Sequence, residues 1–352
     1  MACRIERETS LLPINTLFLD HVRWLRRAAK AHGAEILVEL DSMRAFVRHA
    51  GRHWVMHPQF LTVIDGRQRY IPVFSDAATH FAGWRPHPHD GWPASKDKLV
   101  FKRAARQLGL AVPDIALDGT AQSQDVVVKR AVGSFGEHVH GPYRSSAERP
   151  LRIAEGEFYE KFVEGEHLKV WYWGAQVIGM ERDPAANVVG DGTASIRELI
   201  DRHLALVPGV TEAKLEKILA RCADMLRFDG LDMTHVPAAG QVQRVEFRYG
   251  SDLMKRAERQ IVDLQHDASP QWEALRAAGP LLRQMIPDDV PSPTLFAIDA
   301  VRTPEGRILL LEMNANPIVN PLAYDAILAS FVAEPLAAPA APAAAQPTPT
   351  LN

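Results

Sequence analysis

An amphipathic repeat fills the first patterned stretch of the chain, between residues 15 and 33. Apolar side chains recur there at helical spacing with basic side chains between them, and the apolar set is Leu17, Leu19, Val22, Leu25 and Ala28. This spacing predicts a helix with one buried face, and Gly33 is suited to ending it.

Short segments rich in β-branched and aromatic residues follow this helix. They are separated by glycine or charged turns, notably Asp65-Gly66, and cover residues 35–40, 45–49, 54–57, 60–64 and 70–74. They predict a small α/β lobe over residues 1–95. The lobe boundary is placed in RPHPHDGW, residues 85–92, because its prolines restrict the backbone and interrupt helices. His87 and His89 have no complete ligand set around them, which favours solvated turn residues over a metal site.

The rest of the chain alternates between helical and strand patterns. Helices are predicted at 96–108, 195–203 and 212–227, single strands at 126–129, 243–247 and 295–301, and a strand pair at 158–163 and 167–177. Residues 308–313 are almost wholly apolar apart from Glu312, which predicts a buried central strand. The tail 334–352 is rich in proline and alanine and is predicted to be disordered, because it cannot bury enough apolar area to fold.

Composition and charge narrow the classes of protein. Of the 352 residues, 47% are hydrophobic and 24% are charged, with a net charge of -3. These values are typical of a globular protein with two or three lobes, and they argue against a purely electrostatic nucleic-acid binder. Cys3 and Cys222 lie far apart, which excludes a disulfide-stapled scaffold and favours a reducing compartment. No stretch approaches the ~18 to 20 apolar residues of a membrane span, so we expect a cytoplasmic protein without a membrane partner.

Asp299, Glu312 and Asn314 form the strongest candidate constellation. Asp299 ends one apolar strand, a turn at Pro304-Glu305-Gly306 follows, and the other two residues end the returning strand. A hairpin would therefore bring all three together. Glu312 and Asn314 are two positions apart on an extended chain and share one face, where their oxygens suit hard Mg²⁺ ions that bridge phosphates. The alternative is a hairpin whose polar ends are merely solvated.

A lysine followed by a glycine-rich turn is the second candidate. Lys129 ends the apolar strand Val126-Val127-Val128, and Gly133, Ser134 and Gly136 follow it. A lysine and unobstructed backbone N–H groups can cradle phosphates. The turn lacks the GxxxxGK[ST] pattern of a Walker A loop, and an ordinary hairpin turn beside an exposed lysine is the alternative.

Two acids around a short hinge make the third candidate. Glu160 precedes Phe162 and Val163, whose backbone could meet an adenine edge, and Glu166 follows after Gly165, within reach of ribose hydroxyls. An exposed strand with alternating charges is the alternative. The segment 190–195 nearly matches GxGxxG but lacks the third glycine and a βαβ unit, and the pair His138 and His140 lacks a third ligand, so neither is taken as a site.

The order of these motifs resembles the ATP-grasp superfamily over residues 96–333. The matching segments are Asp97-Lys98, VVVKRAVGSFGEHV, YEKFVEGEHLKV and, after the distant Asp299, LLLEMNANP. The resemblance implies an ATP-grasp fold, an α/β architecture that holds the nucleotide between two lobes, here preceded by the small N-terminal α/β lobe. It implies that Lys98 and Lys129 hold the phosphates under the glycine loop of residues 133–136, and that Glu160, Phe162, Val163, Glu166 and Leu311 line the nucleotide site. Asp299, Glu312 and Asn314 are then the ligands of two magnesium ions, for which Mn²⁺ can substitute.

A closer likeness covers ERDPAANVVGDGTASIRELI and VPAAGQVQRVEF, which look like the ATP-grasp modules of cyanophycin synthetases and bifunctional glutathione synthetases. In that subgroup the second segment leads to an arginine-rich strand, whose arginine Arg248 matches, and then to a turn that approaches the phosphates and substrate. The resemblance makes Arg248 and Lys129 the catalytic residues. Asp252 stands where the subgroup has an asparagine, and the paired glycines that follow are absent. The domains that flank those modules are also absent, so polymer extension by two alternating active sites is not expected.

The resemblance implies an ATP-dependent carboxylate–amine ligase, acting through an acylphosphate on an amino acid or peptide. Two alternatives stay open: a peptide-tailoring ligase that crosslinks a ribosomal precursor, and a non-catalytic nucleotide-binding module. Residues 1–95, which contain Trp54, Tyr70 and Trp84, are expected to contribute substrate or dimer contacts. A homodimer is left open, and no nucleic-acid partner is expected.

Overall fold

The computed structural model describes residues 6–64, 67–118, 124–133, 138–183, 185–207, 210–251, 253 and 260–333. Within them the chain is a mixed α/β protein with four sheets, whose strands pair antiparallel throughout. The expected α/β class is confirmed. None of the described helices is both long and apolar enough to cross a membrane.

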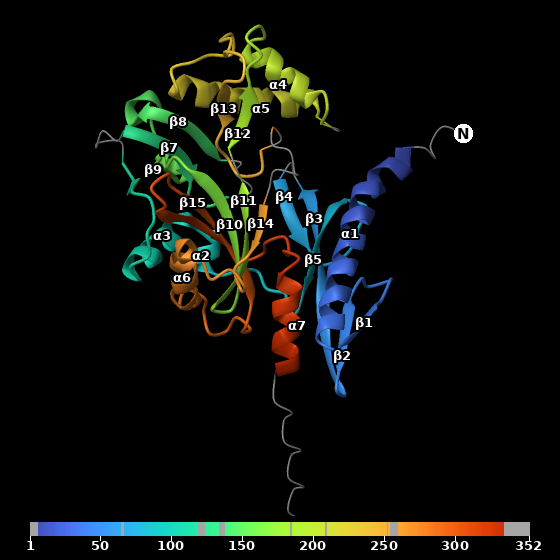
Figure 1. Ribbon diagram of the computed structural model, residues 1–352. Helices are drawn as coiled ribbons and strands as arrows, with labels where there is room; N and C mark the ends of the chain where they lie inside the picture. Colours follow the sequence, from blue (N-terminus) through green and yellow to red (C-terminus); the bar gives the residue numbers. More distant parts are fainter. Residues whose placement is uncertain are drawn as a thin grey trace, which may run out of the picture.

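The N-terminal lobe consists of one long helix against one sheet (Figure 1). Its elements are α1 (Glu6–Ala31), β1 (Glu35–Val38), β2 (Ala45–His49), β3 (Arg52–Ile64), β4 (Arg67–Ile71) and β5 (Ala78–Arg85). The predicted helix is confirmed and begins earlier than the apolar repeat. The strands predicted at 54–57 and 60–64 are one strand, because Pro58 lies beside a register irregularity at Gln59 that accommodates the missing N–H. Strand β5 was not predicted, and the Asp65-Gly66 turn lies outside the described residues.

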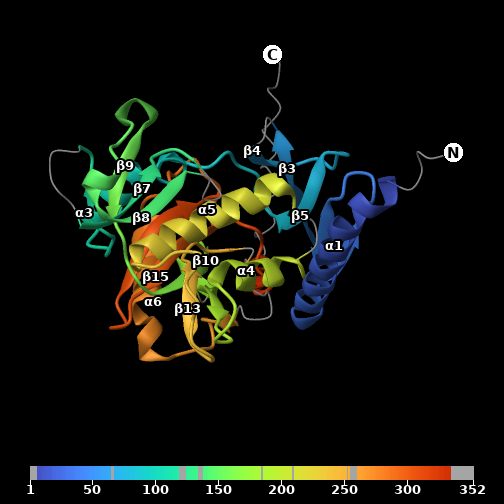
Figure 2. The same cartoon turned by 90° about the horizontal axis from the view of Figure 1, so that it is seen from above.

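The remaining elements build the other three sheets and their helices. They are α2 (Pro93–Lys96), α3 (Lys98–Gln107), β6 (Ile115–Ala116), β7 (Gln124–Arg130), β8 (Val139–Ser145), β9 (Glu157–Lys161), β10 (Glu166–Trp173), β11 (Gln176–Asp183), β12 (Ala186–Val189), α4 (Ile196–Leu204), α5 (Glu212–Phe228), β13 (Val242–Glu246), β14 (Gln260–Asp263), α6 (Glu273–Arg283), β15 (Leu295–Arg302), β16 (Ile308–Asn314) and α7 (Ala323–Ala333). Seen from above, α5 crosses over the sheets, with α4 beside it (Figure 2). The helices predicted at 195–203 and 212–227 are confirmed as α4 and α5.

The order of strands within each sheet follows from their pairing. The sheet of the N-terminal lobe is ordered β1-β2-β3-β4, with β5 on β3. The other three sheets are ordered β6-β9-β7-β8, β12-β13 and β14-β11-β10-β15-β16.

Two strand predictions were wrong in their placement. The segments around β9 and β10 are not a pair: β9 pairs with β6 and β7, whereas β10 pairs with β11 and β15. The chain changes sheet at Gly165, where a Cβ atom would lie 2.1 Å from the Arg302 carbonyl oxygen. Strand β16 was predicted to be central but lies at the edge of its sheet. Leu310 and Met313 are buried because α2 and α3 cover the strand, and the Leu310 N–H donates to the Ala111 carbonyl at 2.9 Å.

The N-terminal lobe shares one apolar core with the sheet β14-β11-β10-β15-β16, which is called the five-stranded sheet from here on. One face of that sheet, through Trp171 and Trp173 of β10, packs with α7 and with the N-terminal lobe. The opposite face, through Leu168 and Tyr172, packs with α3 and α6. Successive side chains of β10 point to opposite faces of the sheet, so one set packs toward the N-terminal lobe and the other toward α3 and α6.

A buried arginine ties the N-terminal lobe to the segment that follows β16. Arg85 donates to the carbonyl oxygens of Ala315 at 3.3 Å and Pro317 at 2.6 Å, and also to Asn316 Oδ1. Tyr324 adds a second link, since its hydroxyl group accepts from the Trp84 N–H at 3.1 Å. The segment directly after Asn314 is thus held by side chains of the N-terminal lobe.

Among the described residues, no three His, Cys, Asp or Glu side chains gather as a metal cluster, at His87 and His89 or elsewhere.

Gly83 should be sensitive to substitution because β5 approaches the α7 region closely there. Its φ is +108°, and a Cβ atom would lie 2.6 Å from Val319 Cβ and 2.9 Å from the Tyr324 hydroxyl oxygen. Gly51 has a similar φ of +79° but no atom within 4 Å of an added Cβ, so it is a matched control. We expect Gly83→Ala to lower the free energy of unfolding by about 2 to 4 kcal/mol and Gly51→Ala by about 1 kcal/mol, in urea titrations. Equal losses would contradict the close packing at Gly83.

Candidate functional site

A row of charged side chains crosses the five-stranded sheet on the face toward the N-terminal lobe. Strand register places Glu181 of β11 opposite Lys169 of β10, Lys169 opposite Asp299 of β15, and Asp299 opposite Glu312 of β16. Lys98, at the start of α3, continues the row with its Nζ 3.0 Å from Glu312 Oε2. Acids and ammonium groups therefore share one strip of the sheet.

The three predicted metal ligands lie together at one end of this row. The hairpin of β15 and β16 pairs Asp299 with Glu312, and Asn314 Nδ2 donates to Asp299 Oδ2 at 3.1 Å. The register shifts between Asp299 and Ala300, so Leu311 is the extra residue of a bulge and lies half-buried beside the pair. Two carboxylates and one amide are hard oxygen donors, and this donor set fits a divalent ion such as Mg²⁺.

The two carboxyl groups differ in their readiness to ionise. Burial raises the pKa of Asp299, and the nearby charge of Glu312 adds to the rise while Lys169 opposes it. Burial also disfavours the Glu312 carboxylate, but Lys98 and Lys129 outweigh that effect and lower its pKa to about 2. Glu312 is thus firmly anionic because two lysines stand close to it.

A carboxylate buried between two lysines lies on one face of the four-stranded sheet β6-β9-β7-β8, which is called the small sheet. Glu160 Oε1 is 2.6 Å from Lys129 Nζ, and Glu160 Oε2 is 2.6 Å from Lys102 Nζ. The side chains are 2%, 11% and 0% exposed, respectively. Burial opposes the charge on Glu160, yet the two ammonium groups lower its pKa; burial likewise lowers the pKa of Lys102, against the pull of Glu160. With all three groups ionised, the cluster carries one positive charge in excess.

Lys98 joins the glycine turn to the metal-ligand pair. Its Nζ donates to the Gly133 carbonyl oxygen at 2.7 Å as well as meeting Glu312. A cavity of about 20 Å³ lies at this point, between α2, the start of α3 and β16. Its lining includes Lys98, Gly133, Glu312 and Asn314. Ser134 and Gly136 lie outside the described residues, so their part in a phosphate loop stays a prediction.

The other predicted site residues are held by neighbours within the chain. Arg248 is buried and donates to Glu246 Oε1 at 2.7 Å and to the Val139 and Gly141 carbonyl oxygens at 3.0 and 3.2 Å. Glu166 accepts two hydrogen bonds from Arg182, at 2.8 and 3.1 Å. Phe162 packs edge-on against Phe228 and Phe247, and Val163 is half-buried after β9. Asp252 lies outside the described residues. The roles expected for Arg248, Glu166 and the hinge stay predictions.

Three polar residues at this site were not predicted. Lys102 is one helical turn after Lys98, which is the signal that could have found it. His167 and Lys169 alternate with Leu168 and Val170 along β10, which indicates a polar face on an otherwise apolar strand. Burial lowers the pKa of His167 to about 4, and Lys129 and Arg248 add to that effect, so its imidazole is neutral near pH 7.

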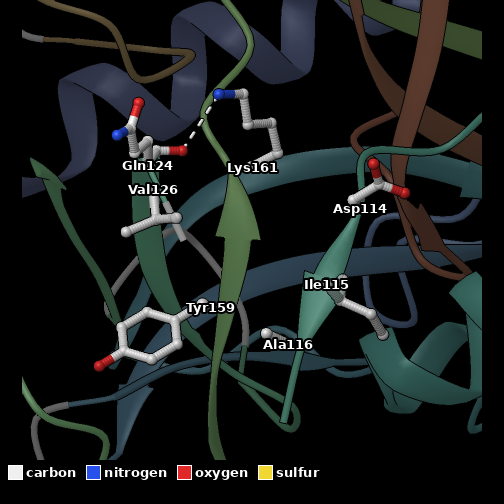
Figure 3. A pocket seen from close by; sticks show the side chains of 7 residues that line it. All are labelled: Asp114, Ile115, Ala116, Gln124, Val126, Tyr159 and Lys161. Atoms are coloured by element: carbon white, nitrogen blue, oxygen red, sulfur yellow. Dashed lines mark hydrogen bonds between the residues drawn. The ribbon is translucent and has the colours of Figure 1, made fainter. Parts of the chain in front are cut away.

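A larger cavity lies away from this site. It has a volume of about 220 Å³ and is lined by Asp114, Ile115, Ala116, Gln124, Val126, Tyr159 and Lys161 (Figure 3). Tyr159 and Lys161 alternate with Glu160 along β9, so they face the opposite side of the small sheet. Their polar atoms are engaged within the chain, since Lys161 donates to the Gln124 carbonyl oxygen and Tyr159 to those of Ser146 and Arg149. The cavity is therefore separate from the lysine cluster.

Comparison with known proteins gives likenesses among solved structures. No model of a known protein family matches the chain, and no curated protein matches it. The chain is similar to a bifunctional glutathione synthetase from Pasteurella multocida, with a TM-score of 0.42 and 12% identity over 92% of this chain and 45% of that chain. It is similar to a D-alanine–D-alanine ligase from Bacillus anthracis, with a TM-score of 0.35 and 11% identity over 68% of this chain and 66% of that chain.

A third similar structure is the ATP-grasp ligase PsnB complexed with a minimal precursor, with a TM-score of 0.33 and 12% identity over 68% of this chain and 61% of that chain. The chain spans less than half the length of the glutathione synthetase and less than two thirds of the other two.

The buried cluster predicts an order of stability among its variants. Glu160→Gln leaves two buried ammonium groups without an acid and should cost about 3 to 5 kcal/mol of unfolding free energy. Lys102→Met leaves one neutralised pair, Lys129 with Glu160, and should cost clearly less. The same Lys102→Met change removes the excess positive charge, so affinity for the ATP analogue AMP-PNP should fall. Urea unfolding and calorimetric titration measure the two effects, and a larger loss of stability for Lys102→Met would contradict the assignment.

Proposed function

We propose that this protein is an ATP-dependent ligase that joins a carboxylate to an amine through an acylphosphate. One observation carries the proposal: two lysines that share one buried acid lie near a set of hard oxygen ligands, close enough for Lys129 to lower the pKa of Glu312. Lys102 and Lys129 share one buried carboxylate, and Lys98 lies beside Glu312 at the metal-ligand pair. A polyphosphate that carries a divalent ion satisfies both halves of such a site.

The Lys102–Glu160–Lys129 cluster suits the nucleotide phosphates. The excess charge of the Lys102–Glu160–Lys129 cluster is buried, and a buried charge is stable only when it is paired. A phosphate oxygen near Lys129 supplies the missing negative charge. Lys98 would hold a second phosphate oxygen from its place beside Gly133, whose backbone begins the proposed phosphate loop with Ser134 and Gly136.

Asp299, Glu312 and Asn314 would hold the divalent ions, which we propose are two Mg²⁺ ions that Mn²⁺ can replace. Bound there, such ions neutralise the negative charge that gathers on a transferring phosphoryl group. The protein's own residues orient this centre, because Asn314 fixes Asp299 and Lys98 fixes Glu312. Arg248, held beneath β8, would add positive potential beside Lys129.

The reaction has two balanced steps. A substrate carboxylate oxygen forms a bond to the γ-phosphorus of ATP as the bond to the bridging oxygen breaks, and ADP leaves with that electron pair. An amine nitrogen then bonds to the acyl carbon, the acyl–oxygen bond breaks, phosphate leaves and the nitrogen loses a proton. The result is an amide. Little covalent chemistry falls to the protein, which positions the reactants and balances charge.

The wider assignments follow the same proposal. Residues 96–333 are proposed to form the ATP-grasp domain and residues 1–95 to contribute substrate contacts, whereas the tail predicted at 334–352 lies outside the described residues. The proposed substrates are amino acids or peptides, and Glu160, Phe162, Val163, Glu166 and Leu311 are proposed to line the nucleotide. The separated cysteines support a reducing, cytoplasmic location.

Release of ADP from Mg-ATP tests the proposal directly. The purified protein is incubated with pools of amino acids, dipeptides and short peptides, and products are weighed by mass spectrometry. We expect ADP in a pool-dependent manner, with a product lighter by one water than the sum of its two parts. ATP binding without ADP release in every pool would contradict the ligase assignment.

Glu312→Ala should abolish turnover because it removes the more anionic of the two metal-ligand carboxylates. We expect ADP release to fall at least about a hundredfold with the circular dichroism spectrum unchanged. Glu305→Ala is the matched control, since Glu305 is an exposed acid in the turn of the same hairpin. Equal ADP release by Glu312→Ala and Glu305→Ala would refute the metal assignment.

A further inference from the structure

Lys169 lies at the centre of the charged row and has no role in the function proposed so far. Its Nζ is 2.9 Å from Asp299 Oδ1, and both side chains are largely buried, at 16% and 20% exposure. The strand register places it between Glu181 and Asp299. It is therefore two strands away from Glu312, at a distance of about 10 Å along the sheet.

Two tyrosines from different parts of the chain interact with Lys169, Tyr249 through its ring and Tyr70 through electrostatics. The Tyr249 ring, which follows β13, has its centroid 5.2 Å from Lys169 Nζ, and its hydroxyl group donates to Glu181. Tyr70 comes from β4 of the N-terminal lobe. Burial raises the pKa of Tyr70, while the charges of Lys169 and Arg85 oppose the rise and that of Asp299 adds to it. Tyr70 thus lies within electrostatic reach of the Lys169–Asp299 pair.

Lys169 and a divalent ion compete for the same oxygen. Asp299 Oδ2 accepts from Asn314, and Asp299 Oδ1 is taken by the Lys169 ammonium group. Oδ1 cannot serve a divalent ion at full strength while the ammonium group stays, because the two cations repel at that distance. When Asp299 binds a divalent ion, Lys169 loses its partner and becomes a buried ammonium group that needs another anion.

The position of Lys169 indicates which anion that is. The nucleotide phosphates have Lys98, Lys102 and Lys129 on the far side of β16 and at the small sheet. Lys169 lies on the other side of the metal ligands, on the sheet face toward the N-terminal lobe, with the centroid of the Tyr249 ring 5.2 Å from its Nζ. A carboxylate there would face the phosphates across Asp299 and Glu312, which is the arrangement that in-line phosphoryl transfer requires.

We propose that Lys169 binds the substrate carboxylate that receives the phosphoryl group, and that a divalent ion at Asp299 makes this lysine available to it. The inference rests on the proposed function and deepens it, because it locates the carboxylate substrate between the charged row and the N-terminal lobe. It also gives the divalent ion and the substrate a shared dependence on one side chain. Lys169 is then a catalytic residue, whereas Lys102, which acts through Glu160, is a positioning residue.

Direct measurement of Mn²⁺ binding tests the competition without any turnover. The full-length protein is titrated with Mn²⁺ in the absence of nucleotide, and free Mn²⁺ is followed by electron paramagnetic resonance. Lys169→Met removes the competing ammonium group, so the dissociation constant should fall at least about threefold. Lys169→Arg places a two-pronged donor on Asp299 and should raise it. Lys217→Met, an exposed lysine of α5, is the control and should leave it unchanged.

The substrate arm uses the amino-acid and dipeptide pool that supports ADP release. With Mg-ATP saturating, Lys169→Met should raise the pool concentration for half-maximal rate at least about tenfold. Affinity for AMP-PNP with Mn²⁺ should stay within about twofold of the parent protein, because the phosphate lysines are untouched. Lys169→Arg should retain part of the substrate affinity, and Lys217→Met all of it.

The outcomes separate this inference from the function on which it rests. A parent protein that binds neither Mn²⁺ nor AMP-PNP refutes the proposed function itself. A parent protein that binds both and releases ADP, with Lys169→Met binding Mn²⁺ no more tightly or keeping its pool half-saturation, overturns the role of Lys169 alone. If Lys169→Met unfolds, as judged by circular dichroism, Lys169→Arg decides the question: Mn²⁺ binding equal to or tighter than that of the parent refutes the competition.

Discussion

The antiparallel register of β10 with β15 is the constraint on which the candidate site depends. It places Lys169 opposite Asp299, and the next pairing places Asp299 opposite Glu312. A shift of one residue in either pairing would turn these side chains into the apolar core beneath the sheet, where Leu168 and Val170 now lie. The apolar face therefore enforces the charged face: the core residues under α3 and α6 cannot be exposed without burying unpaired charges. Apolar packing on one face of the sheet therefore fixes the positions of the charged side chains on the other face.

Charge is distributed unevenly between the Lys102–Glu160–Lys129 cluster and the hairpin of β15 and β16. At the small sheet, two lysines share one buried acid, so positive charge is in excess. At the hairpin, Asp299 and Glu312 stand side by side, each with one lysine. Anionic phosphates are favoured toward the first cluster and cations toward the second. Because Lys98 touches both the Gly133 carbonyl oxygen and Glu312, any movement of the glycine turn is coupled to the metal-ligand pair.

The parts of the site that the sequence predicted are those built by local contacts. Asp299, Glu312 and Asn314 belong to one hairpin, so strand alternation and a turn were enough to bring them together. Lys102 and Lys169 were missed as site residues because their neighbours are decided by long-range pairing: Lys102 meets Glu160 across two elements, and Lys169 meets Asp299 across 130 residues. Two strand placements were wrong for the same reason. The edge position of β16 and the assignment of β9 and β10 to different sheets depend on which strands meet, and periodicity carries no such information.

The N-terminal lobe is built into the site and is not an appendage to it. Arg85 holds the three residues after Asn314, and Tyr324 joins α7 to both the Trp84 N–H and His21 of α1. Since these groups are buried, separating the lobe from the five-stranded sheet would expose the shared core and leave a guanidinium group without its carbonyl partners. The shared core therefore fixes the N-terminal lobe, which carries Tyr70 on β4, relative to the sheet. If the substrate carboxylate binds between the lobe and the sheet, as proposed, the shared core fixes the spacing of the two surfaces that contact it, so the site selects a carboxylate by shape as well as by charge.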